Sequence, residues 1–145
     1  MFRVLFVCSG NICRSPTAEA VLRAQIAERG LQDEIEVDSA GTGDWHVGQA
    51  PDRRATAAAA RRGIVLTGTA RQVGPSDFDE FDVILAVDRQ NLDELHRIAQ
   101  PGVEQKIRML DTGDVPDPYY GGPSGFEDVL DQVAKACAAL LDELA

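Results

Sequence analysis

The sequence is poor in cysteine and in positive charge. It has only three cysteines in 145 residues, too few and odd in number for a disulfide-stapled fold, so a reducing, cytoplasmic setting is expected. Lys and Arg number 14 against 24 Asp and Glu, which gives a formal net charge of −10. This charge argues against nucleic-acid binding and against a polybasic membrane anchor. Any anion site must therefore be local, built from backbone N–H groups and one or two basic side chains.

Long apolar runs are also missing. None approaches the roughly 18 residues that a membrane-spanning helix needs, and the apolar stretch at the start is shorter than that of a signal peptide. We therefore expect no membrane association. The rest of the composition, 44% hydrophobic and 26% charged, is ordinary for a globular protein. A chain of this length predicts one domain over residues 1–145.

Apolar runs alternate with helical patterns along the chain. Short apolar runs predict strands at residues 2–7, 35–38, 83–87 and 107–110, with a weaker candidate at 64–66. Helical patterns are found at 15–29, 51–63 and 91–99 and from 124 onward. This alternation predicts an α/β fold, a doubly wound sheet of about four parallel strands flanked by helices. Ligands of such sheets bind outside the carboxyl ends of the strands.

The segment after the first predicted strand carries most of the chemistry. Cys8 is followed by five residues and then Arg14, between a strand and a helix for which Ser15 is the predicted N-cap. A loop that enters a helix points backbone N–H groups at one spot, and the helix dipole adds positive charge there. Gly10 allows a backbone conformation closed to other residues, and Arg14 can donate two hydrogen bonds to one oxyanion. We expect a phosphate-binding loop here.

Cys8 is the candidate nucleophile of this loop. The positive field favours its thiolate, which can accept a phosphoryl group without help from a histidine base. The alternative is a small buried side chain at a strand end. Asp117, stiffened by Pro118, is the best candidate to protonate a leaving group, although the segment taken alone is more simply explained as a surface turn with an exposed acid. The three cysteines lack the spacing of a structural zinc site, so no metal or cofactor is expected.

These residues resemble a known family over most of the chain. Five segments are similar, in order and at compatible spacing, to blocks of the low-molecular-weight protein tyrosine phosphatases: VCSGNICRSPTAEAV at 7–21, SAGTGDWHVGQAPD at 39–52, ARQV at 70–73, VDRQNL at 87–92 and DPYYGG at 117–122. The resemblance implies that Cys8 forms a phosphocysteine, that Arg14 clamps the phosphate, and that Asp117 is the general acid and then the base. It implies a phosphotyrosine-containing protein as substrate and leaves the oligomeric state open.

The resemblance also assigns supporting residues. It places the loop residues Ser9, Gly10, Asn11, Ile12, Cys13 and Ser15 around the phosphate. It implies that Asn11, Ser15 and Ser39 hold the loop by hydrogen bonds, and that the walls of the cleft are Ile12, Trp45, Tyr119 and Tyr120. Cys13 also matches a position that pairs with Cys8 on oxidation, and simple packing explains it equally well. One departure is Thr67-Gly68, where the family often has Ser-His with the His in this network; the network must be closed differently here.

Several alternatives stay open. Arsenate reductases of this architecture need further downstream cysteines, and this chain has only Cys137 there. Arginine phosphatases of the family tend to have Thr where this chain has Ile12. A catalytically silent phosphopeptide-binding module is disfavoured by the intact set of Cys8, Arg14 and Asp117. His46 is equally compatible with substrate contact and with a surface position, and the acidic excess in residues 77–94 is interpreted as a solvated face.

Overall fold

The fold is built on one four-stranded parallel sheet. The computed structural model describes residues 1–118 and 124–144, so the predicted cleft residues Tyr119 and Tyr120 lie outside the described part. The strands are β1 (Phe2–Cys8), β2 (Ile35–Gly41), β3 (Val83–Ala86) and β4 (Ile107–Met109). They lie in the order β2-β1-β3-β4, with all neighbours parallel. The predicted α/β class and the four-stranded parallel sheet are confirmed.

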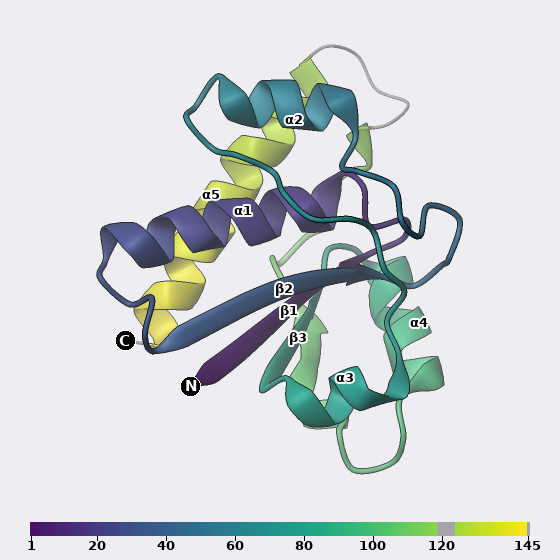
Figure 1. The fold of residues 1–145 in the computed structure, drawn as a ribbon. Helices are drawn as coiled ribbons and strands as arrows, with labels where there is room; N and C mark the ends of the chain where they lie inside the picture. The colour runs from purple at the N-terminus through teal and green to yellow at the C-terminus, as the bar shows by residue number, and fades with distance from the viewer. Residues whose placement is uncertain (119–123, 145) are drawn as a thin grey trace.

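Helices cover both faces of the sheet (Figure 1). They are α1 (Arg14–Glu28), α2 (Arg53–Ala60), α3 (Pro75–Glu80), α4 (Arg89–Ile98) and α5 (Ser124–Leu144), with a 3-10 turn at Glu104–Lys106. Helices α1, α2 and α5 lie on one face, and α3 and α4 on the other. Alternate residues of β1 feed the two cores: Val4 and Phe6 pack under α1 and α5, while Leu5 and Val7 pack under α3 and α4. Because both faces are covered, β1 is apolar and buried from Val4 to Cys8.

The weak strand candidate at 64–66 is wrong. Val65 is 72% exposed and only Leu66 of this segment is buried, so the segment cannot lie as a strand inside the sheet. The chain reaches the sheet later, where Gln72 forms a single bridge with Gly41 at the end of β2. Helix α3 was not predicted because its six residues are too few to show a helical period.

The start of α1 also differs from the prediction. Cys13, and not Ser15, is the N-cap residue, and it makes no side-chain capping bond. Ser15 lies inside the first turn, where its hydroxyl contacts Cys8 and Asn11. The predicted end is confirmed, because Gly30 follows the helix with φ 70°, a left-handed conformation suited to glycine.

The topology leaves a crevice beside the end of β1. From β1 the chain passes to α1 on one face, and from β3, the neighbouring strand, it passes to α4 on the other face. The segments that follow β1 and β3 therefore diverge, which is where open α/β sheets bind ligands. Cys8 ends β1, and Asp88 is the N-cap of α4 just after β3.

Within residues 1–118 and 124–144, no helix combines the length and the apolar character that crossing a bilayer requires.

The packing of α1 against the sheet and α5 can be tested by truncating Leu22. Leu22 is fully buried between the sheet and α5, and its truncation leaves a cavity that the packed core cannot close. Leu22→Ala should lower the free energy of unfolding by about 2–5 kcal/mol, measured by urea denaturation. The control Val65→Ala, at an exposed side chain, should change it by less than about 0.5 kcal/mol. Equal effects of the two substitutions would contradict this packing.

Candidate active site

The loop from Cys8 to Ser15 turns its backbone N–H groups toward one point. Three of its carbonyl oxygens accept hydrogen bonds from outside the loop: Cys8 from Thr42 N–H at 2.9 Å, Ser9 from Gly43 N–H at 3.0 Å and Ile12 from Asp52 N–H at 2.7 Å. In a trans peptide the N–H points opposite to the C=O. The N–H groups of Ser9, Gly10 and Cys13, which share these peptide units, therefore face the inside of the loop. This arrangement suits an oxyanion.

Asn11 holds the loop in an uncommon backbone conformation. Its φ of 56° lies in the left-handed region, which residues other than glycine rarely adopt. The buried side chain compensates through three hydrogen bonds: Nδ2 donates to Ser15 Oγ at 2.8 Å and to Ser39 Oγ at 3.0 Å, and Oδ1 accepts from Arg71 N–H at 2.9 Å. As a result the backbone N–H of Asn11 donates to Cys8 Sγ at 3.2 Å.

The two cysteines of the loop lie in different surroundings. Cys8 Sγ lies 2.9 Å from Ser15 Oγ and accepts the Asn11 N–H, so two polar groups can stabilise a negative sulfur. Burial, followed by the charge of Asp52, raises the pKa of Cys13 to about 12. Cys13 therefore remains a neutral thiol near pH 7. Burial alone raises the pKa of Cys137 to about 12 as well.

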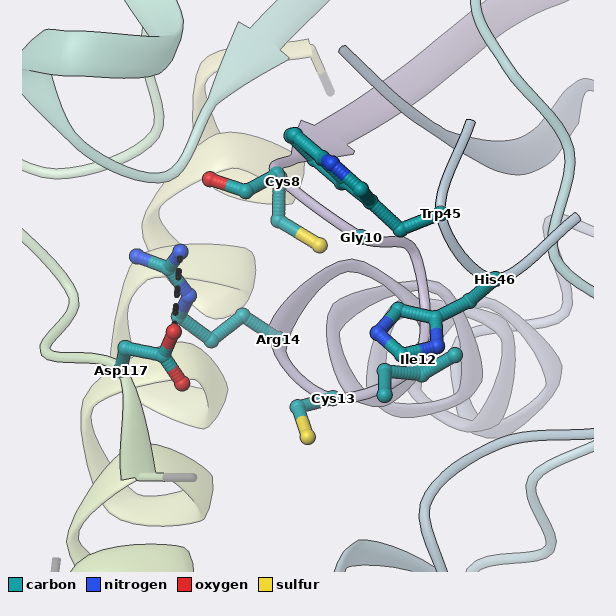
Figure 2. A pocket seen from close by; sticks show the side chains of 9 residues that line it. Cys8, Gly10, Ile12, Cys13, Arg14, Trp45, His46 and Asp117 are labelled. Carbon is teal, nitrogen blue, oxygen red and sulfur yellow. Dashed lines mark ion pairs between the residues drawn. The ribbon is translucent and has the colours of Figure 1, made fainter. Parts of the chain in front are cut away.

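Arg14 is buried, and two hydrogen bonds fix one of its terminal nitrogens. Its Nη1 donates to Asp88 Oδ2 at 2.6 Å and to the carbonyl of Val115 at 3.0 Å. These two contacts occupy Nη1, so an incoming oxyanion can take the fork formed by Nη2 and Nε. Nη2 also lies 3.9 Å from Oδ2 of Asp117, whose side chain is 47% exposed (Figure 2). The carboxyl of Asp117 thus stands close to the place where the oxyanion would bind.

These residues line one cleft of about 400 Å³. Its lining comprises Cys8, Ser9, Gly10, Ile12, Cys13, Arg14, Trp45, His46 and Asp117. Figure 2 shows Arg14 and Asp117 on one side, facing Trp45 and His46 on the other. The backbone role predicted for Gly10 is wrong, because the left-handed conformation of this loop belongs to Asn11. What the absent side chain of Gly10 allows is a close approach, since a Cβ there would come within 2.8 Å of the His46 ring. Across the described ranges, no group of three or more His, Cys, Asp or Glu side chains could hold a metal ion.

Sequence reasoning missed the acidic partners of the site. The interpretation of residues 77–94 as a solvated face is wrong for Asp77, which is buried against Arg71, and for Asp88, which binds Arg14. Asp88 also caps α4 through the N–H of Asn91. Asp88 follows directly after a predicted buried strand, and this position was the sequence signal that could have placed it at the site. Glu19, which accepts a hydrogen bond from Ser39, gave no sequence signal at all.

Comparison with known proteins points to one family. Residues 3–145 match the family described as low molecular weight phosphotyrosine protein phosphatase. The chain is 45% identical to the low molecular weight protein-tyrosine-phosphatase of Streptomyces coelicolor, over 97% of this chain and 92% of that relative. A crystal structure of a protein tyrosine phosphatase from Entamoeba histolytica with Hepes in its active site superposes with a TM-score of 0.96 at 41% identity, covering 99% and 97% of the two chains. The structure of a Drosophila arginine phosphatase superposes with a TM-score of 0.92 at 36% identity, covering 97% and 96%.

The anion-binding geometry predicts how Arg14 responds to substitution. Arg14→Lys keeps the charge but loses the planar fork, so it should weaken binding of orthovanadate, an oxyanion, by about tenfold or more. Calorimetric titration measures this affinity. The control Arg29→Lys, at a surface ion pair with Asp142, should bind as the unmodified protein does. Unchanged binding by Arg14→Lys would remove Arg14 from the anion site.

Proposed function

Because the chain belongs to the low molecular weight phosphotyrosine protein phosphatase family, we propose that it hydrolyses phosphotyrosine in proteins through a phosphocysteine on Cys8. One observation carries the proposal. A buried thiol and a buried guanidinium share a loop whose N–H groups converge, and an exposed carboxyl stands 3.9 Å from that guanidinium. Groups suited to act as nucleophile, oxyanion clamp and proton donor therefore line one cleft, which supports the proposal.

The first step transfers the phosphoryl group to sulfur. The non-bridging phosphate oxygens accept hydrogen bonds from the inward N–H groups of the loop and from Nη2 and Nε of Arg14, which stabilise their charge. Cys8 Sγ attacks phosphorus, so the S–P bond forms while the bond from phosphorus to the tyrosine oxygen breaks. The departing oxygen takes the proton of the Asp117 carboxyl and leaves as a neutral phenol. No histidine base is needed.

The second step returns the enzyme to its starting state. The Asp117 carboxylate accepts a proton from a water molecule as the water oxygen attacks phosphorus. The S–P bond breaks, its electron pair returns to Cys8 Sγ, and inorganic phosphate leaves. Ser15 Oγ and the Asn11 N–H, both in contact with that sulfur, favour its departure as a thiolate.

Ile12 and Trp45 support an aromatic substrate. Both line the cleft beside Cys8, and the Trp45 ring is 67% exposed, so it offers a flat apolar face to a tyrosine ring. The net charge of −10 disfavours nucleic acid and anionic membranes as partners. We place the reaction in the cytoplasm, where the reducing environment keeps Cys8 as a thiol or thiolate.

A substrate panel tests the proposed function. Phosphotyrosine peptides should be hydrolysed far faster than phosphoserine or phosphoarginine peptides of the same sequence. Cys8→Ser should abolish turnover because an alcohol is barely ionised near pH 7. Cys13→Ser is the matched control and should keep substantial activity, since the Cys13 thiol stays protonated. Preference for phosphoarginine would instead favour the arginine-phosphatase alternative, and turnover by Cys8→Ser would reject the nucleophile.

Asp117→Asn tests the general acid. Tyrosine, with a phenol pKa of about 10, leaves poorly unless it is protonated, so kcat on phosphotyrosine should fall by about 10²–10⁴. The loss on nitrophenyl phosphate, an activated ester, should be smaller, and the basic limb of the kcat profile against pH should flatten. Equal losses on both substrates with an unchanged pH profile would make Asp117 a structural turn residue.

Peroxide should inactivate the enzyme reversibly. Peroxide oxidises the Cys8 thiolate to a sulfenic acid, and the Cys13 sulfur then attacks it to form a disulfide and release water. Because the pKa of Cys13 is raised to about 12, its reactive thiolate becomes more abundant with rising pH. Bridge formation should therefore be faster at about pH 9 than at about pH 7. Peptide mapping that finds irreversibly oxidised Cys8 and no Cys8–Cys13 bridge at either pH would contradict this.

A further inference from the structure

Trp45 lies on a loop that backbone hydrogen bonds fix on both sides of it. Before Trp45, the N–H of Gly43 donates to the carbonyl of Ser9 in the phosphate-binding loop at 3.0 Å. After Trp45, the N–H of Gly48 donates to the carbonyl of Ala70 at 2.9 Å. The backbone that carries the Trp45 ring is therefore held at a fixed place beside the phosphate-binding loop.

Gly43 leaves open the space that the Trp45 ring occupies. A Cβ on Gly43 would overlap with the Cζ3, Cη2 and Cε3 atoms of Trp45, which are its three nearest neighbours. The six-membered ring of the indole therefore lies directly against the backbone of Gly43. The φ of Gly43 lies outside the left-handed region, so alanine suits the backbone there and its conflict is with the ring.

This contact orders a side chain that is largely open to solvent. Trp45 is 67% exposed, and an exposed side chain loses rotamer freedom when a ligand binds to it. Ordering one such side chain weakens binding by about two- to tenfold. Because the Trp45 ring already rests on Gly43, an aromatic ligand meets a wall that needs little further ordering.

We propose that Gly43 is a positioning residue that sets the preference of the cleft for aryl over alkyl phosphates. It does so by holding the Trp45 ring at a fixed place across the cleft from Arg14 (Figure 2). A ligand whose phosphate binds at Arg14 then gains from a flat ring that lies against Trp45, and an alkyl group lacks that ring. The effect on turnover rests on the proposed function, whereas the effect on binding does not.

Two phosphate analogues that cannot be hydrolysed separate the ring from the phosphate. The unmodified protein should bind phenylphosphonate more tightly than methylphosphonate in calorimetric titrations. Gly43→Ala should weaken phenylphosphonate binding by about two- to tenfold and leave methylphosphonate binding unchanged. On an aryl phosphate substrate, KM should rise by a similar factor with little change in kcat. Gly113→Ala is the matched control, because a Cβ there meets open space, and it should change none of these values.

The tryptophan itself gives a readout that needs no ligand. Trp45 is the only tryptophan of the chain, so fluorescence excited where tyrosine does not absorb reports this ring alone. In Gly43→Ala the displaced ring should be quenched more strongly by acrylamide and should emit at longer wavelength, whereas Gly113→Ala should match the unmodified protein. A merely structural role of Gly43 would lower the melting temperature and leave the fluorescence of the folded protein unchanged.

A double substitution tests whether Gly43 acts through the ring. In a Trp45→Ala background, Gly43→Ala should have no further effect on phenylphosphonate affinity. An effect that persists without the ring, or a loss of methylphosphonate affinity, would assign the effect to the hydrogen bond with Ser9 and overturn the proposal. Unchanged phenylphosphonate affinity or unchanged fluorescence in a folded Gly43→Ala would also overturn it.

Folding of the variants is itself informative. If Gly43→Ala does not fold but the double variant with Trp45→Ala does, the conflict with the ring is established and the proposal stands. If neither variant folds, Gly43 is required by the backbone and the proposal is rejected. Absence of phosphotyrosine hydrolysis by the unmodified protein would reject the proposed function and leave the phosphonate affinities and the fluorescence as the test of Gly43.

Discussion

The site depends on the left-handed backbone of Asn11. At φ 56° the chain turns sharply enough for the Asn11 N–H to reach Cys8 Sγ, and an L-residue holds that conformation only when its surroundings fix it. Here the amide of Asn11 binds Ser15, Ser39 and the backbone of Arg71, which come from α1, β2 and the segment after α2. The loop therefore takes this shape only when α1, β2 and the segment after α2 have packed around it.

The cleft is suited to an anion although the protein as a whole is acidic, because a few donor groups lie close together in it. The net charge is −10, yet the cleft combines inward N–H groups, the start of α1 and one buried guanidinium. The Asp88 carboxylate accepts a hydrogen bond from Arg14 and fixes the orientation of the guanidinium. The guanidinium therefore does not have to be ordered when an oxyanion binds. A lysine could not be held in this way, because its ammonium has no planar fork.

The sequence was sufficient for those features that are local. Strand β1 and the loop after it follow from neighbouring residues. The structure places Cys8 and Arg14, at the two ends of that loop, in one cleft. The partners of Arg14 and Ser39 that are distant in sequence did not follow from local patterns. Asp88 is 74 residues from Arg14, Glu19 is 20 residues from Ser39, and each pair meets only after the strands align. The apolar segment at 64–66 failed as a strand because the position beside β2 is reached later in the chain.

The central claim is that the phosphoryl group passes through Cys8. Rapid acid quenching of Asp117→Asn during turnover of nitrophenyl phosphate should trap the intermediate, because this substrate needs no proton to leave while hydrolysis of the intermediate lacks its base. Mass mapping of the quenched protein should find one phosphoryl group on Cys8, together with a burst of nitrophenol before the steady state. A phosphoryl group on another residue, or turnover with neither burst nor phosphorylated protein, would contradict the account.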